Sequence, residues 1–286
     1  MKTEPRKTAA VFFPFDCFGS AGTGRGAELL ADAVREMLSD NRQEQMPARG
    51  HCYTPHIQVR EIAFATEKDI SSWRAQGRAI IRKTLASSKR LVWATGNHLG
   101  VLPLFDELGA DAKETLVLQF DAHLDIYNLT DCESQPSHGN YLMHAASKLP
   151  RIINVGSRDL MLPVEHVRKY YEAVFPAAAL AHDSSWALAA LVKAAKKAER
   201  LVLDLDCDVF DPAFFPATLH PLPFGLAPSV LLRVLEAIGP ERFEIVAFSE
   251  YAPSRDREDQ SLSTLLWLLE TFFLRWYETG LTAAET

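Results

Sequence analysis

The chain has 286 residues, of which 48% are hydrophobic and 23% charged, and its formal net charge is −7. This composition is typical of globular proteins, and the length is sufficient for a large α/β domain with a sizeable core. The negative charge and the lack of a lysine and arginine cluster argue against a nucleic-acid partner. No stretch is long and apolar enough to span a bilayer, so we expect no membrane partner either.

Short apolar runs alternate with amphipathic segments along the chain. Strands are predicted to begin at Thr8, Ile57, Arg90, Thr115, Arg151, Arg200 and Phe243, with a weaker strand near 178–181. Helices are predicted over 26–38, 69–86, 163–174, 185–198 and 228–238, and a surface loop over 39–55. The alternation favours a three-layer α/β/α fold with a mostly parallel sheet of about eight strands. No linker divides the chain, so we expect a single domain over residues 1–286.

The cysteines and the N-terminal segment bear on the compartment. The four cysteines are far apart and form no C-x-x-C pair: Cys17, Cys52, Cys132 and Cys207. We interpret them as free thiols in a reducing compartment. The N-terminal apolar run is short and interrupted by Pro14, which favours a first strand over a signal peptide. We therefore expect a cytoplasmic protein.

A cluster of polar residues follows directly on each of four predicted strands. His98 follows the strand that begins at Arg90, and Glu250 follows the one that begins at Phe243. The other two clusters are Asp121, His123 and Asp125, and Asp204, Asp206, Asp208 and Asp211. Ligands of open α/β sheets bind outside the carboxyl ends of the strands, so the four clusters could converge at one edge.

The types of these residues indicate a metal site. Asp121, His123 and Asp125 would face one side of the sheet if the strand continued through them. Such carboxylates repel one another and are costly to bury unless cations compensate. Mixed carboxylate and imidazole ligands suit Mn²⁺, with Zn²⁺ or Fe²⁺ as alternatives. The candidate ligands are more than one tetrahedral ion uses, which favours two ions that share carboxylates and activate water. These candidates are His98, Asp121, His123, Asp125, Asp206 and Asp208.

Each motif alone has a plainer interpretation. A single D-x-H-x-D or D-x-D-x-x-D-P is most often a solvated turn or a helix cap. His98 alone, after a Gly-Asn turn, could be an ordinary loop residue. The metal interpretation depends on all the motifs standing at strand ends of one α/β chain.

The motifs GNHLG, DAHLD, SHGN, DLDCDVFDPAFFP and SEYAPSRD resemble those of the ureohydrolases, the arginase and agmatinase family, in that family's order. DCDVFDPAFFP is similar to the agmatinase-type version, and the first glycine-rich loop and helix are also similar. The resemblance covers nearly the whole chain and implies an arginase-like fold and a pair of Mn²⁺ ions. One ion would be held by His98, Asp121, Asp125 and Asp206, and the other by His123, Asp121, Asp206 and Asp208.

The resemblance also implies catalytic roles. Glu250 would pair with the substrate guanidinium, and His138 would move protons to the leaving amine while Asp125 completes the catalytic set. Two alternatives stay open: Glu250 could be the buried partner of Arg255 or another arginine, and His138 could merely begin a helix. Asp211 is expected to order its loop rather than bind a metal.

Three positions depart from the family's pattern. Asn97 replaces an acid beside the first ligand, which puts that supporting contact in doubt. Met161 stands where arginases carry an aspartate that helps bind the α-amino group of free arginine, and Tyr127 replaces an asparagine at the same end. Only the guanidinium end is retained, so we expect a substrate without a free α-amino-acid head.

Two functions compete. The leading hypothesis is a peptide arginase, which would convert arginine residues of a peptide to ornithine and urea as a post-translational modification. The alternative is a small-molecule ureohydrolase, an agmatinase or arginase acting on a free guanidino compound. A metal-binding protein without activity, or a deacylase with one metal, would leave Glu250 without a role. Family members often form trimers or hexamers, so a homo-oligomer is possible.

Overall fold

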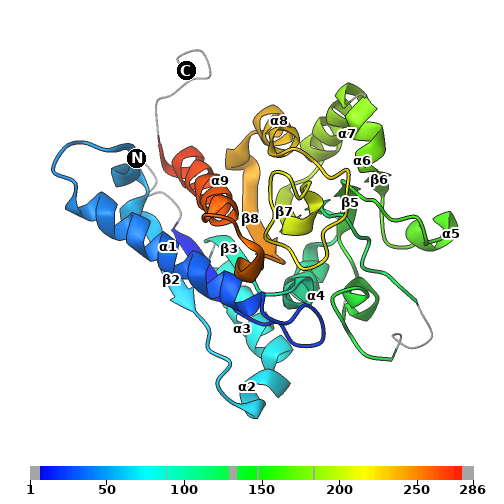
Figure 1. The fold of residues 1–286 in the computed structure, drawn as a ribbon, viewed down its shortest axis with the longest axis horizontal. Coiled ribbons are helices and arrows are strands. Elements are labelled where there is room, and N and C mark those ends of the chain that lie inside the picture. The colour runs from blue at the N-terminus through cyan, green and yellow to red at the C-terminus, as the bar shows by residue number, and fades with distance from the viewer. Residues whose placement is uncertain (1–6, 88, 129–133, 147, 183, 279–286) are drawn as a thin grey trace.

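The computed structural model describes residues 7–87, 89–128, 134–146, 148–182 and 184–278. They contain one sheet of eight strands in the order β2-β1-β3-β8-β7-β4-β5-β6, and every strand pairing is parallel (Figure 1). The strands are β1 Thr8–Phe13, β2 Ile57–Glu61, β3 Arg90–Thr95, β4 Thr115–Phe120, β5 Arg151–Val155, β6 Ala173–Phe175, β7 Arg200–Asp206 and β8 Phe243–Ser249. The predicted α/β class and parallel sheet are therefore confirmed.

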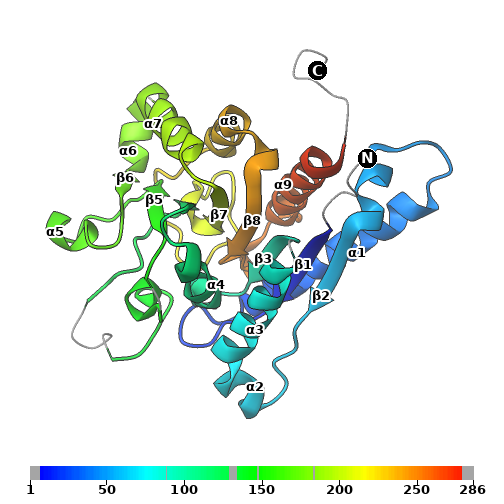
Figure 2. The ribbon, with the colours of Figure 1, turned by 180° about the vertical axis from the view of Figure 1, so that it is seen from behind.

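Helices cover both faces of the sheet (Figures 1 and 2). They are α1 Gly24–Gln43, α2 Glu67–Ser71, α3 Trp73–Ala86, α4 Leu102–Leu108, α5 Val164–Val167, α6 Ala177–His182, α7 Ser185–Lys196, α8 Pro228–Ile238 and α9 Gln260–Tyr277. Alternate side chains of β1 enter different cores: Ala10 and Phe12 belong to the core that includes residues of α1, α7, α8 and α9, whereas Val11 and Phe13 belong to the core that includes residues of α3 and α4. Burial on both faces explains why the central strands are nearly continuous apolar runs.

One strand and one helix were predicted at the wrong positions. The segment 178–181 belongs to helix α6, not to a strand, as its high alanine content would favour. The eighth strand of the sheet is instead the edge strand β6, Ala173–Phe175, which overlaps the end of the segment predicted as a helix over 163–174. That helix is limited to the four residues of α5. The edge strand β6 has only three residues and is defined by its pairing with β5, which no local pattern reveals.

Three smaller findings concern the loop, the cysteines and the membrane. The segment predicted as a loop over 39–55 is largely ordered, because α1 continues into it and two short 3₁₀ helices follow, with Tyr53 fully buried between them. Cys17, Cys52 and Cys207 are free thiols, and Cys132 lies outside the described residues. None of the described helices has the length and apolarity needed to cross a membrane.

The strand order explains how the candidate site is assembled. Strands β3, β8, β7 and β4 are consecutive neighbours at the centre of the sheet. One of the four polar clusters predicted from the sequence stands at the carboxyl end of each: the β7 cluster begins within the strand, at Asp204, and the other three follow their strands. Because the strands are parallel, all four clusters leave the sheet at the same edge.

Candidate metal centre and active site

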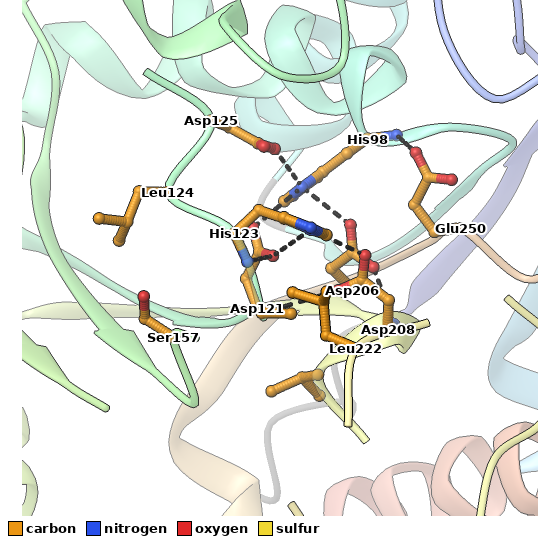
Figure 3. Close-up of polar contacts among 12 residues, drawn as sticks. His98, Asp121, His123, Leu124, Asp125, Ser157, Asp206, Asp208, Leu222 and Glu250 are labelled. Carbon is orange, nitrogen blue, oxygen red and sulfur yellow. Dashed lines mark hydrogen bonds and ion pairs between the residues drawn. The ribbon is translucent and has the colours of Figure 1, made fainter. Parts of the chain in front are cut away.

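The side chains of all six predicted metal ligands converge at the carboxyl edge of the sheet (Figure 3). Two groups of these residues have ligand atoms that all lie within 4.8 Å of one another. One group is His98, Asp121 and Asp125, and the other is Asp121, His123 and Asp208. Asp121 belongs to both groups, as a residue shared by two neighbouring ions would.

The first group surrounds one nitrogen of a buried imidazole. His98 Nδ1 lies 2.8 Å from Asp125 Oδ2, 3.1 Å from Asp206 Oδ2 and 3.3 Å from Asp121 Oδ2. Within the described part of the chain, neither His98 Nδ1 nor Asp121 Oδ2 has a hydrogen-bond partner. Carboxylate oxygens gathered around an unpartnered ring nitrogen form a donor set that fits a divalent cation.

The second group is built around His123. Its Nδ1 lies 3.0 Å from Asp208 Oδ2 and 3.9 Å from Asp121 Oδ1. Asp206 adjoins this group through its Oδ1, which accepts a hydrogen bond of 2.9 Å from the backbone N–H of Asp208. The donor set again combines imidazole nitrogen and carboxylate oxygen, so it could hold a second ion of the same kind.

Regular strand geometry does not account for the D-x-H-x-D motif. Strand β4 ends at Phe120, and Asp125 has a left-handed backbone with φ of 48°, so the expected alternation along a continuing strand is wrong. The loop is instead held by the amide of Asn154 on β5, which donates to the carbonyl oxygens of Asp121 and His123. Glu250 also has a positive φ, of 61°. Positive φ values outside glycine are uncommon and concentrate at functional sites.

Glu250 presents a carboxylate to the centre of the site. Its Oε1 accepts a hydrogen bond of 3.0 Å from the backbone N–H of His98 and lies 3.4 Å from His138 Nδ1. Its Oε2 is buried and has no hydrogen-bond partner among the described residues. The recorded ion-pair partner is thus His138 rather than Arg255. A buried carboxylate oxygen without a partner is costly, and a cationic ligand would compensate it.

His138 lies in a turn and does not begin a helix, since the next 3₁₀ helix starts at Tyr141. Its Nδ1 is 3.3 Å from the hydroxyl of Ser20 as well as near Glu250. Burial disfavours the charged imidazole, but the hydrogen bond and charge of Glu250 outweigh this and raise the pKa of His138. The side chain is therefore well suited to hold a proton beside Glu250.

Comparison with known proteins decides the family. The model of the arginase family matches residues 6–274. The chain belongs to the arginase family. The agmatinase of Proteus mirabilis is 27% identical over an alignment of 259 residues, which covers 86% of this chain and 79% of that protein. The agmatine ureohydrolase of Thermoplasma volcanium superposes with a TM-score of 0.74 at 19% identity, covering 96% of this chain and 90% of its own. The arginase of Bacillus subtilis superposes with a TM-score of 0.74 at 17% identity, covering 97% of this chain and 100% of its own.

Membership establishes the protein as an arginase-family hydrolase with the arginase fold. The structural neighbours are too distant in sequence to show more than the fold. The relatives named agmatinase do not confirm the peptide-arginase subgroup that the sequence suggested.

Several residues of this arginase-family protein line the site without having been predicted. They are Ser20, Tyr141 and His220. Asp204 is expected from the sequence only as a member of an acidic cluster, and it contacts His98 Nε2. The ring of His220 lies 5.3 Å from that of His138. Ser20 belongs to the glycine-rich first loop, which packs so closely that a Cβ at Gly19 would lie 2.9 Å from His138 Cγ. That loop was noticed in the sequence, but nothing there assigned it to the catalytic edge.

The three positions that depart from the family pattern differ in exposure: Asn97 is fully buried, Tyr127 is half-buried and Met161 is exposed. Asn97 donates to the carbonyl oxygen of Cys17, so it anchors the first loop. Burial and a hydrogen bond to Asp159 raise the pKa of the half-buried Tyr127. Asp159 also accepts the backbone N–H of Met161, whose side chain is exposed. The side chains of Tyr127 and Asp159 are therefore hydrogen-bonded neighbours. The backbone of Met161 is bound to the same aspartate, and its side chain is exposed to solvent.

The metal-free site is electrostatically unfavourable at neutral pH. Burial, with the charge of Asp125, raises the pKa of Asp121 to about 7. Burial and neighbouring carboxylates raise the pKa of Asp206 well above its usual range. Burial also disfavours a charged His123, but Asp208 reverses the effect and raises the pKa of His123 to about 11. Without metal, the site thus retains protons that the unfolded chain would release.

These shifts predict how the stability of the metal-free protein depends on pH. Because the pKa of Asp121 is raised in the folded protein, its favourable contribution to the free energy of unfolding is lost as pH rises from about 4 towards 7. The contribution of His123 is complete below about pH 6.5 and is lost as pH rises towards its folded-state value of about 11. Both changes have the same sign, so the urea midpoint in EDTA should be lower at pH 8 than at pH 5.

With metal bound, we expect the protein to gain stability as pH rises, because ligand atoms bind ions in their deprotonated form. Excess Mn²⁺ should therefore raise the urea midpoint more at pH 8 than at pH 5. Asp121→Asn serves as the comparison, since it should reduce the pH-dependence of the metal-free protein. A metal-free midpoint that increased from pH 5 to pH 8, equally in both proteins, would contradict the prediction.

Proposed function

We propose that the protein is a dimanganese ureohydrolase that releases urea from a guanidino compound without a free α-amino-acid head. The observation that supports this best is the buried Oε2 of Glu250, which has no partner among the described residues, beside two histidine–aspartate groups joined at Asp121. The two histidine–aspartate groups suit metal cations, and the carboxylate of Glu250 suits a planar organic cation such as a guanidinium.

In this proposal His98, Asp125 and Asp206 hold one Mn²⁺, His123 and Asp208 hold the other, and Asp121 contributes to both. Asp206 is close enough to the second group to be shared as well. When bound, the two ions would activate water and stabilise the negative charge that develops during hydrolysis. Among the described residues the two groups combine imidazole and carboxylate without a thiolate, and this mixture favours Mn²⁺.

The remaining steps fall to side chains of the chain itself. Glu250 Oε2 accepts N–H groups of the guanidinium and fixes the position of its central carbon. Water adds to that carbon, the bond to the substituted nitrogen breaks, and this nitrogen needs a proton to leave as an amine. His138, beside Glu250 and Ser20, is the side chain that would deliver it. Urea and the amine are the products.

A free guanidino compound such as agmatine is the first candidate for the substrate. Relatives that this chain matches over most of its length are named agmatinases. Agmatine lacks the α-carboxylate of arginine and so has no free α-amino-acid head. It keeps a primary ammonium group, which the exposed Met161 would leave to solvent. The alternative that the sequence ranked second therefore takes precedence over a peptide.

A peptidyl arginine remains the second candidate because the loops around the site expose apolar side chains. Leu160 is 98% exposed, Phe224 83% and Met161 69%. The loops that carry them are in contact, since the guanidinium of Arg158 donates to the carbonyl oxygen of Leu222. An apolar rim of this kind could bind residues that flank an arginine.

A substrate panel tests the proposal. The Mn²⁺-loaded protein should release urea from agmatine, with little from free arginine, and none after treatment with EDTA. Arginine-containing peptides should be tested by mass spectrometry, where conversion to ornithine removes about 42 Da per residue through hydrolysis. Urea from agmatine alone supports the first candidate, and the mass change on peptides alone supports the second. Full metal loading without urea or mass change on any guanidine would disprove a ureohydrolase.

A further inference from the structure

A row of polar side chains crosses three central strands beneath the candidate site. Gln119 on β4 is the register partner of Asn154 on β5 and of Asp204 on β7. All three are essentially inaccessible to solvent. Polar groups in the middle of a buried parallel sheet are costly unless each is hydrogen-bonded, so their partners indicate what the row supports.

The partners of this row are parts of the site above it. Asn154 holds the carbonyl oxygens of Asp121 and His123, and Gln119 donates a hydrogen bond of 2.9 Å to the hydroxyl of Tyr141. Asp204 is the charged member of the row. Its Oδ2 lies 3.2 Å from His98 Nε2, and this is its recorded ion pair among the described residues.

Asp204 therefore stands behind the imidazole, on the side away from the metal groups. The opposite nitrogen, His98 Nδ1, faces the carboxylates of Asp121, Asp125 and Asp206. A neutral imidazole carries one N–H, and only the nitrogen without it has a lone pair for a metal ion. Binding through Nδ1 thus requires that the proton be on Nε2.

Without Asp204, the hydroxyl of Tyr141 could favour the tautomer of His98 that has its proton on Nδ1. Its hydroxyl oxygen lies 3.2 Å from His98 Nε2 and 3.5 Å from Asp204 Oδ2, and it accepts the N–H of Gln119. A hydroxyl can donate to Nε2 and so favour the tautomer with the proton on Nδ1. An ionised carboxylate can only accept, which holds the proton on Nε2 and also occupies the Tyr141 hydroxyl proton.

We propose that Asp204 is a positioning residue that keeps His98 in the Nε2–H tautomer and thereby supports the metal ion of the His98 group selectively. The inference deepens the proposed function and rests on its metal centre. His123 lies in the other group, with Asp208 and not Asp204 beside its ring. Removal of Asp204 should consequently weaken the binding of the ion in the His98 group and leave the binding of the other ion unchanged.

The experiment measures metal binding rather than turnover. Wild type, Asp204→Leu and Asp204→Asn are stripped of metal and titrated with Mn²⁺ by calorimetry, and electron paramagnetic resonance distinguishes a coupled ion pair from an isolated ion. Leucine has a similar size but accepts no hydrogen bond, whereas asparagine keeps an acceptor oxygen. In the leucine variant, one of two sites should weaken about 10- to 100-fold, the usual effect of losing such a partner. The asparagine variant should be intermediate.

A double variant separates tautomer control from simple packing. Adding Tyr141→Phe to Asp204→Leu removes the competing donor, so binding at the weakened site should partly recover. Circular dichroism establishes that each variant is folded. If the leucine variant fails to fold, the asparagine variant alone decides. Two sites of unchanged affinity in a folded variant, or equal weakening of both sites, would overturn the role of Asp204. A wild type that does not bind two ions would instead overturn the proposed function.

Discussion

Asp121→Asn should abolish urea release and prevent the binding of two Mn²⁺ ions. Asp121 is the residue common to both groups of ligand atoms, so its loss weakens both at once. An amide has one acceptor oxygen and no charge, whereas the carboxylate offers two oxygens, and each faces a different histidine. We expect urea release from agmatine to fall by at least about 10⁴-fold, since metal activation of water contributes most of the rate.

Asp111→Asn is the matched control for this substitution. Asp111 precedes the amino end of the same strand, β4, and pairs with Arg200 at the surface. Exposed pairs of this kind contribute at most about 1 kcal/mol, so activity and metal content should be unchanged. Both variants are measured for bound manganese by mass spectrometry and for urea. Two ions and ordinary activity in Asp121→Asn would be incompatible with a shared carboxylate at this position.

The sheet could be predicted because burial leaves a clear pattern in its central strands. All six residues of β4 are buried, and the sequence shows them as a run that is apolar except at Thr115 and Gln119. Strand β6 has no such pattern, since two of its three residues are only partly buried and the segment is a strand through its pairing with β5. Local sequence patterns therefore identify strands whose residues are buried in the core. They do not identify a strand that forms only because it pairs with a neighbouring strand.

The candidate ligands could be predicted because each stands at the last position of its strand or within a few positions after it. What the sequence did not show was that β3, β8, β7 and β4 are adjacent, although this adjacency brings His98, Asp121 and Asp206 together. Ser20 lies 118 positions from His138, with which its hydroxyl is in contact. Contacts of this range depend on how loops pack over the edge, which has no periodic signal.

Asp204 illustrates a different failure. It was noticed as part of an acidic cluster after a strand, together with Asp206 and Asp208, because all three are spaced by two. Yet it lies within β7, beside Gln119, and contacts the far nitrogen of His98. Residue type and spacing identify the acidic group, but only the depth of each carboxylate in the sheet separates a ligand from its support.

Glu250→Gln should leave both metal sites intact while urea release falls steeply. Glu250 is not among the groups that could hold an ion, and its unpartnered Oε2 is the atom proposed to receive the guanidinium. Loss of one partner of a buried charge pair costs about 2–5 kcal/mol, and each 1.4 kcal/mol is a factor of ten. We therefore expect kcat/KM for agmatine to fall by about 30- to 4,000-fold with two Mn²⁺ retained.

The comparison with Glu244→Gln makes this result interpretable. Glu244 lies at the other end of β8 and pairs with Arg200, so the same chemical change there should have little effect. Glutamine and glutamate have the same shape, so the left-handed backbone at position 250 is not altered by size. The hydrogen bond from the His98 N–H can also be kept, because an amide oxygen accepts it. A loss of activity at constant metal content would then reflect the charge of Glu250, whereas full activity would show that the guanidinium is held elsewhere.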